Sequence, residues 1–179
     1  VYTTVSVYAD KEEVGSDGVA GLHSDWMEHF ITYLAQMQDV NVLTALRNSK
    51  CLSADVNAAY DPTFPDVMDP RNSCYINKGV VITKYTGARG KSGTSDASAE
   101  YMGKIRRMLN ANDVVWQIGE LGKVDAGGGG TVAMYVANLD IDTIDLGVPV
   151  LSMHAPLEVV SKLDVYMAYR AFKVFFEQK

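Results

Sequence analysis

Apolar and polar residues recur along this chain with two periods, one typical of strands and one typical of helices. Residues 2–9 alternate and are mostly β-branched or aromatic, which predicts a strand. Residues 24–38 carry apolar side chains at helical spacing, which predicts a helix with one apolar side. The residues of that side are Trp26, Phe30, Tyr33, Leu34 and Met37. Residues 158–177 predict a long final helix in the same way.

The rest of the chain predicts strands that alternate with helices. Buried strands are expected over residues 51–56, 79–84, 114–118 and 144–153. Residues 92–96 are expected to form a turn, in which Ser95 or Asp96 caps a helix that ends at Leu109. This order of elements predicts an α/β fold with a mixed, largely parallel sheet and helices on both faces.

Composition narrows the class of protein. The chain has 179 residues, 47% of them hydrophobic, which is enough for one domain with a core. Its net charge of −6 argues against binding to nucleic acid or an anionic membrane, since both need basic surface. The sequence has no run of about 18 apolar residues, so it predicts no membrane-spanning helix. The first residues lack the features of a secretory signal. Cys51 and Cys74 have neither disulfide-framework nor metal spacing, so a cytoplasmic location is expected.

Polar residues follow four of the predicted strands. Glu12 and Glu13 come after the first strand, Asp55 ends the second, Asp125 follows a later one, and His154 follows the last. In open α/β sheets, ligands bind beyond the carboxyl ends of the strands. We therefore expect these residues to contribute to one site.

The adjacent pair Glu12 and Glu13 has two interpretations. The pair can be a solvated turn, which is the commoner fate of two neighbouring glutamates. Alternatively, because neighbouring strand residues point to opposite faces, one carboxylate can coordinate a metal while the other reaches a metal-bound water. The second carboxylate would then accept the proton of that water.

Asp55 and His154 also have structural alternatives. Asp55 can cap a turn, and His154 can be a core or capping histidine. As a metal ligand, Asp55 would be a carboxylate at the tip of a buried strand, and His154 would be held rigidly by the apolar strand before it and Pro156 after it. Aspartate, glutamate and histidine without cysteine suit zinc, manganese or cobalt with an open coordination position.

A glycine loop over residues 126–130 leads into a predicted short helix over residues 131–138. It lacks the lysine and the spacing of a P-loop. Its functional interpretation is close backbone approach to a peptide-like ligand, with Gly128, Gly129, Gly130 and Thr131 as the binding residues. A plain flexible loop is the alternative.

Four stretches of the chain together resemble the vacuolar and aspartyl aminopeptidase family, above all its clostridial-type bacterial members: DKEEVGSDG, LSADVNAAYDP, DAGGGGTVA and VPVLSMHAPLEV. The resemblance implies a zinc-peptidase, or phosphorylase/hydrolase-like, architecture with two divalent metal ions, zinc first and manganese or cobalt as alternatives. It implies Glu12 as the general base, Glu13 and His154 as ligands of one ion, and Asp55 as a ligand of the other. It also implies an aminopeptidase that acts on peptides with free N-termini and assembles as a homo-oligomer, commonly a dodecamer.

The same resemblance predicts that residues 1–179 are the C-terminal part of the catalytic domain, truncated at the N-terminus. In the family, a histidine and a bridging aspartate complete the metal site, and both lie upstream of the Glu-Glu motif. We therefore expect this chain alone to hold metal poorly and to lack peptidase activity. Two alternatives stay open: a related di-metal deacylase or carboxypeptidase on the same scaffold, and a non-catalytic structural or assembly fragment.

Overall fold

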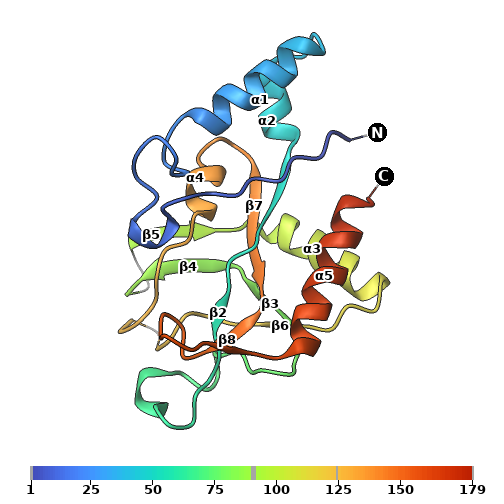
Figure 1. The fold of residues 1–179 in the computed structure, drawn as a ribbon. Helices are drawn as coiled ribbons and strands as arrows, with labels where there is room; N and C mark the ends of the chain where they lie inside the picture. The colour runs from blue at the N-terminus through green and yellow to red at the C-terminus, as the bar shows by residue number, and fades with distance from the viewer. Residues whose placement is uncertain (1, 90–91, 124, 179) are drawn as a thin grey trace.

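A four-stranded mixed sheet forms the centre of the computed structural model, which describes residues 2–89, 92–123 and 125–178 (Figure 1). The strand order is β1–β7–β3–β6, with the bounds Lys50–Ser53, Asp142–Gly147, Val80–Thr83 and Trp116–Ile118. β1 pairs with β7 and β3 pairs with β6 in parallel, whereas β3 and β7 are antiparallel. Two of these three pairings are parallel, which confirms the predicted mixed, largely parallel sheet.

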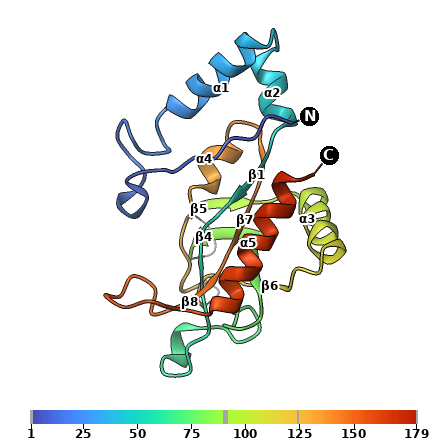
Figure 2. The same ribbon diagram turned by 45° about the vertical axis from the view of Figure 1, so that its right-hand side comes forward.

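Two long helices cover one face of this sheet (Figures 1 and 2). α3 (Ala99–Ala111) and α5 (Lys162–Phe176) bury apolar side chains against alternate residues of β3 and β7. Each helix begins after a serine cap: Ser98 accepts a hydrogen bond from the N–H of Tyr101, and Ser161 accepts one from that of Leu163. The main core therefore lies between this sheet face and the two helices. Its largest members include Val80, Ile82, Tyr101, Ile105, Leu109, Ile144 and Leu146.

Shorter helices lie on the other face and at one end of the sheet. α4 (Ala133–Ala137) packs on β7 from the side opposite to α3 and α5 (Figure 1). α1 (Trp26–Met37) and α2 (Val42–Asn48) stand together beyond the top of the sheet (Figures 1 and 2). A second core cluster joins these helices through Leu22, Met27, Leu46, Val136 and Ile141. Helices on both faces of the sheet are thus confirmed.

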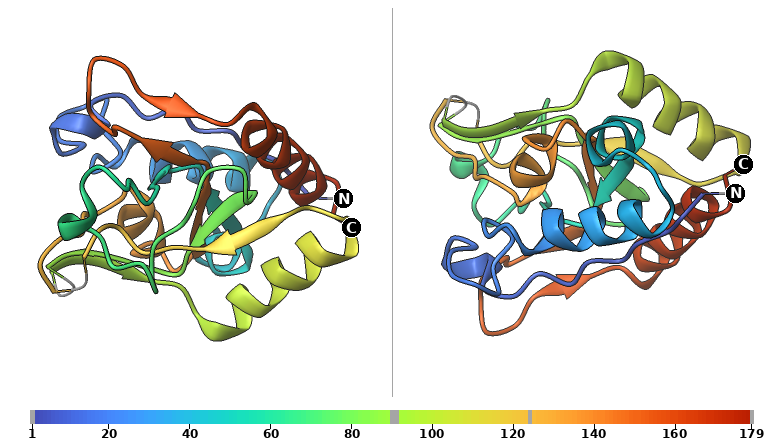
Figure 3. Two further views of the ribbon diagram at one scale, coloured as in Figure 1. Left: turned by 90° about the horizontal axis from the view of Figure 1, so that it is seen from below. Right: turned by 90° about the horizontal axis from the view of Figure 1, so that it is seen from above.

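The remaining elements are short. A three-stranded sheet contains β2 (Asn57–Ala58), β8 (Pro149–Leu151) and β9 (Val159–Val160). A hairpin contains β4 (Tyr85–Ala88) and β5 (Ser92–Asp96). Two 3₁₀ turns, η1 (Glu12–Val14) and η2 (Pro65–Val67), lie in loops. Figure 3 shows the loop that carries η1 beside the loop that follows β8. Within the described ranges, no helix is long and apolar enough to cross a membrane.

The strand predicted over residues 2–9 is wrong. These residues have no regular secondary structure, and Tyr2 and Tyr8 are 71% and 92% exposed. Alternation makes a strand only when backbone N–H and C=O groups find a partner strand, and no described strand pairs with this segment.

Three further sequence predictions need correction. Residues 92–96 form β5 rather than a turn, because they pair with β4 and so satisfy their backbone groups. The cap of α3 is therefore Ser98 and neither Ser95 nor Asp96. The helix expected over residues 158–177 begins only at Lys162, since β9 uses the residues before Ser161. α2 was missed because its seven residues bury only Leu46, too few positions for a visible period.

Candidate functional site

Glu12 and Glu13 begin a single 3₁₀ turn, η1, rather than following a strand. Lys11 before the turn and Gly15 after it have φ values of 62° and 99°, so the chain changes direction at both ends. The expectation that strand alternation separates the two glutamates is therefore wrong. They differ instead in burial, since Glu12 is half-buried and Glu13 is exposed.

A close backbone contact holds the loop that carries η1. Ser16 is 2% exposed, and its N–H donates to the carbonyl of Lys11 at 2.8 Å. Its own carbonyl accepts a hydrogen bond from the N–H of His23 at 3.1 Å. A Cβ at Gly21 would lie 1.9 Å from the Ser16 oxygen, so this approach requires glycine.

His154 lies in the turn after β8 and faces Glu13. Its φ of 65° lies in the left-handed region, which is unusual for a residue other than glycine. Its N–H donates to Glu158 Oε1 at 2.6 Å, which fixes the turn. Its Nε2 lies 3.1 Å from Glu13 Oε2, and the two side chains are 68% and 73% exposed.

Asp55 follows β1, and its backbone packs directly on β7. A Cβ at Gly147 would lie 1.8 Å from the Asp55 carbonyl oxygen, so only glycine permits this approach. The chain then re-enters a parallel pairing, in which the N–H of Asn57 donates to the carbonyl of Val148 at 3.0 Å. Asp55 is thus a half-buried carboxylate at the end of a strand, as the sequence predicts.

The three carboxylates and His154 influence one another electrostatically. Burial raises the pKa of Glu12, the charges of Asp55 and Glu13 raise it further, and His154 opposes them. Burial also raises the pKa of Asp55, with a further contribution from Glu13. The N–H of Val56 and then His154 lower the pKa of Asp55. Asp55 and His154, which are far from Glu12 in the sequence, are therefore close enough to Glu12 to shift its pKa.

The donor chemistry of this cluster fits part of a zinc site. Zinc takes carboxylate and imidazole donors, and the cluster offers three carboxylates and one imidazole. Within the parts of the chain that the structure describes, however, no three histidine, cysteine, aspartate or glutamate side chains are arranged to hold a metal ion. The structure brings Glu13 and His154 into contact and places Glu12 and Asp55 nearby. It does not assemble a complete set of ligands from the described residues.

The glycine loop packs backbone to backbone against the β4–β5 hairpin. The N–H of Arg89 donates to the carbonyl of Gly127 at 2.7 Å. A Cβ at Gly128 would lie 2.2 Å from the Gly87 oxygen, and one at Gly130 would lie 2.9 Å from the Gly93 oxygen. The loop therefore needs these glycines to reach the hairpin.

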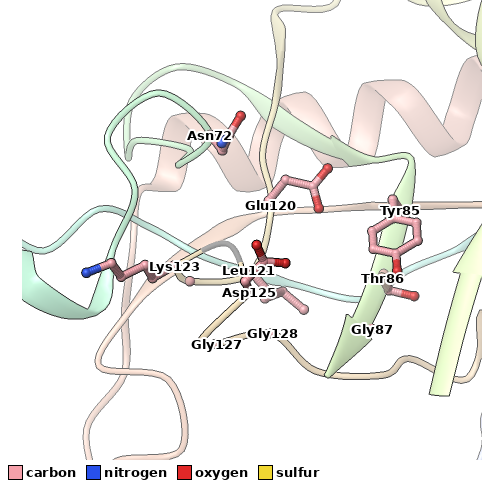
Figure 4. Close-up of a pocket in the computed structure, with 11 residues that line it drawn as sticks. Asn72, Tyr85, Thr86, Gly87, Glu120, Leu121, Lys123, Asp125, Gly127 and Gly128 are labelled. Carbon is pink, nitrogen blue, oxygen red and sulfur yellow. The ribbon is translucent and has the colours of Figure 1, made fainter. Parts of the chain in front are cut away.

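Beside this contact lies a cavity of about 290 Å³ (Figure 4). Gly127 and Gly128 form part of its wall, while Gly129, Gly130 and Thr131 do not. Figure 4 shows the carboxylates of Glu120 and Asp125 inside it and the Lys123 side chain directed away from them. Burial and then Asp96 raise the pKa of Glu120, whereas Lys84 lowers it.

Sequence reasoning missed a buried polar group on β7. Asp145 is 3% exposed, and its Oδ2 accepts a hydrogen bond from Thr131 Oγ1 at 2.9 Å. Thr131 itself is 6% exposed. Burial raises the pKa of Asp145 to about 7, against the hydrogen-bonding effect of Ser53 and Thr131. The available signal was a carboxylate inside the otherwise apolar strand expected over residues 144–153.

Solved aminopeptidases share this fold. Aminopeptidase I from Clostridium acetobutylicum superposes with a TM-score of 0.85 at 49% identity, over 93% of this chain and 36% of that one. The M18 aminopeptidase from Thermotoga maritima gives a TM-score of 0.88 at 41% identity, over 93% of this chain and 38% of that one. The fold is therefore that of the zinc peptidases.

The family follows from the sequence as well. The chain belongs to the family described as "Aminopeptidase I zinc metalloprotease (M18)", whose model matches residues 2–176. It is 46% identical over 177 residues to the "Probable M18 family aminopeptidase 1" of Clostridium acetobutylicum. That alignment includes 97% of this chain and 38% of the relative, so the chain spans about two fifths of the relative's length. The sequence-based family prediction is confirmed.

Proposed function

We propose that residues 1–179 are the C-terminal part of the catalytic domain of a metal-dependent aminopeptidase, which removes the N-terminal residue from peptides. The observation that carries this proposal is the convergence of Glu12, Glu13, Asp55 and His154 from three separate segments. Two of these side chains are exposed and three are acidic, so neither packing nor charge balance explains the cluster. A catalytic role within a peptidase family explains it better.

Glu13 and His154 would hold one divalent ion, and Asp55 would hold the other. The family description supports zinc, and manganese and cobalt accept the same donors. When bound, such ions lower the pKa of a water molecule and polarise the peptide carbonyl. The remaining ligands, a histidine and an aspartate by the family resemblance, would come from elsewhere in the protein or from another chain.

Glu12 is the proposed general base. Its raised pKa makes its carboxylate a stronger proton acceptor than an ordinary glutamate. It would accept a proton from the attacking water and return it to the leaving amine. Glu12 is only half-buried, so water can still reach its carboxylate.

Peptides with free N-termini are the proposed substrates. The glycine loop, with Gly128, Gly129, Gly130 and Thr131, would present backbone N–H groups to the peptide, because glycine lets another backbone approach closely. Gly128 already contributes to the wall of the cavity in Figure 4.

A homo-oligomer, with a dodecamer as the first expectation, and a cytoplasmic location are also part of this proposal. A solved structure described as the dodecamer of yeast mApe1 has the same fold, with a TM-score of 0.76 at 24% identity. The two cysteines are free thiols, which agrees with a reducing compartment.

The decisive experiment uses the complete enzyme and its Glu12→Gln variant. We expect a loss of turnover of about a hundredfold or more, because a general base typically contributes 10²–10⁴-fold. Metal content, measured by mass spectrometry, should stay close to that of the wild type. Glu100→Gln, an exposed change at the start of α3, is the matched control and should leave both unchanged.

A panel of peptides with free and acetylated N-termini tests the reaction class. Preferred cleavage of free N-termini supports the aminopeptidase, and preferred cleavage of blocked ones would replace it with a deacylase. The isolated 179-residue chain should bind zinc weakly and cleave nothing. Tight binding of two zinc ions by that chain would contradict the proposed need for further ligands.

A further inference from the structure

A row of buried polar side chains crosses the sheet on the face opposite to α3 and α5. Asp145 on β7 is paired in register with Ser53 on β1 and with Thr83 on β3. Their exposed fractions are 6% for Ser53, 3% for Asp145 and 4% for Thr83. A strand buried on both faces normally carries apolar residues, so a carboxylate at its centre needs an explanation.

One oxygen of Asp145 holds the end of the glycine loop. Oδ2 accepts the hydroxyl of Thr131, the residue that follows Gly130. The same hydroxyl oxygen accepts the N–H of Ala133 at 3.3 Å, where α4 begins. The other attachments of the loop are its backbone approaches to the hairpin, at Gly127 and Gly128 and again at Gly130. The Thr131 bond adds an attachment to β7 at the end of the loop where α4 begins.

Asp145 is also paired in register with Ser53 on β1, the strand that leads to Asp55. Oδ1 of Asp145 and Oγ of Ser53 are both buried without a hydrogen bond of ordinary geometry among the described residues. Ser53 is nevertheless close enough to lower the pKa of Asp145, and the charge of Asp55 acts in the opposite direction. Ser53 precedes Asp55 by two residues. Asp145 thus lies between the glycine loop and the segment that carries a proposed metal ligand.

We propose that Asp145 is a positioning residue that ties the end of the glycine loop, through Thr131, to β7, the strand that pairs with the one that leads to Asp55. This inference rests on the proposed function of the loop and the cluster. The hydrogen bond from Thr131 to Asp145 would keep the backbone of the proposed peptide-binding loop at a fixed place relative to the proposed metal ligands. Asp145 contacts neither substrate nor metal, and it acts through Thr131.

The test compares variants of the complete enzyme that differ in one hydrogen bond. Thr131→Val removes the hydroxyl and keeps the shape, whereas Thr131→Ser keeps the hydroxyl. Asp145→Asn keeps an acceptor for that hydroxyl, whereas Asp145→Leu does not. Thr143→Val is the matched control, because Thr143 is a buried threonine on the same strand and face whose hydroxyl donates to the Ile141 carbonyl instead.

We expect Thr131→Val and Asp145→Leu each to raise KM for a peptide by about tenfold, the effect of one lost hydrogen bond. kcat should change much less, and bound zinc should stay at the wild-type level. Thr131→Ser and Asp145→Asn should stay within about threefold of the wild type, and Thr143→Val should have no effect on KM. The double variant Thr131→Val/Asp145→Leu should be no worse than the worse single variant, because both remove the same bond.

Hydrogen exchange of the hydrogen-bonded amides at the two ends of the loop, Gly127 and Ala133, gives a readout that does not depend on activity. Exchange should accelerate in Thr131→Val and stay slow in Thr131→Ser. An unchanged KM in Thr131→Val, equal damage from Thr131→Ser, or loss of zinc in Thr131→Val would each overturn the inference. If the wild-type enzyme hydrolyses no peptide, the proposed function fails, and the exchange experiment still decides whether Asp145 anchors the loop.

Discussion

The two faces of β7 contrast within a single pair of neighbouring residues. Leu146 is fully buried and packs between the sheet and the helices α3 and α5. Asp145 is almost equally buried on the opposite face, yet it has one hydrogen bond and one oxygen without a partner. Burial alone therefore does not distinguish a residue that stabilises the fold from one with the positioning role proposed for Asp145.

The difference lies in what each face gains from burial. The apolar face gains free energy for every side chain removed from water. On the polar face, burial of the Asp145 carboxylate costs free energy, because that carboxylate leaves water without a cationic partner among the described residues. It is this second face that leads to the glycine loop and to Asp55.

The largest expected effect is on the apolar face. Leu146→Ala should lower the free energy of unfolding by about 2–5 kcal/mol, because it leaves a cavity between β7 and the two helices. Urea denaturation of the wild type and the variant measures this. Ile144→Val, a smaller change on the same face, should cost about 0.5–1.5 kcal/mol. A loss below about 1 kcal/mol for Leu146→Ala would show that this face is not the main core.

The next effect is the pH dependence that Asp145 gives to stability. Its pKa is raised from 3.8 to about 7, so the folded protein keeps a proton that the unfolded chain releases between these values. The free energy of unfolding should therefore fall as pH rises from about 4 to 7 and level off above that range. A shift of this size corresponds to at most about 4 kcal/mol.

Asp145→Asn isolates this contribution, because the amide does not titrate. Its stability should fall less between pH 4 and pH 7 than that of the wild type, as measured by urea midpoints at several pH values. The raised pKa values of Asp55 and Glu12 leave a residual slope of the same sign in both proteins. Equal slopes in the two proteins would mean that Asp145 is already ionised at low pH in the folded state.

The contrast between the faces also explains what the sequence could predict. Apolar periodicity identified β3, β7 and α3, whose apolar side chains are buried in the main core. It also located α1 and α5, although Phe30, Tyr33 and Met37 of α1 are 45%, 67% and 82% exposed. It failed at residues 2–9, where alternation is present but no described strand supplies hydrogen bonds. Pairing is a tertiary property that local spacing does not encode, and the same limit hid β5.

The residues proposed for the site could be selected from the sequence where the chain marks them locally. Asp55 and His154 follow strands, and the motifs around them resemble a known family. Asp145 is marked only as a carboxylate inside an otherwise apolar strand, and its proposed role depends on a contact with Thr131 fourteen positions away. The close approach of Gly147 to Asp55 is equally invisible in sequence, because it joins two strands that only the fold brings together.

The smallest expected effect is at the exposed pair of the site. Glu13 and His154 lie 3.1 Å apart, but both side chains are more than two thirds exposed. In metal-free protein, Glu13→Gln should change the free energy of unfolding by less than about 1 kcal/mol, since water screens such pairs. If Glu13 is the ligand proposed above, the same substitution should markedly weaken zinc binding, measured by titration calorimetry of the complete enzyme, because it removes a charged donor. Destabilisation of several kcal/mol without metal would instead make the pair a structural ion pair, and the functional contrast between the exposed cluster and the buried Asp145 would disappear.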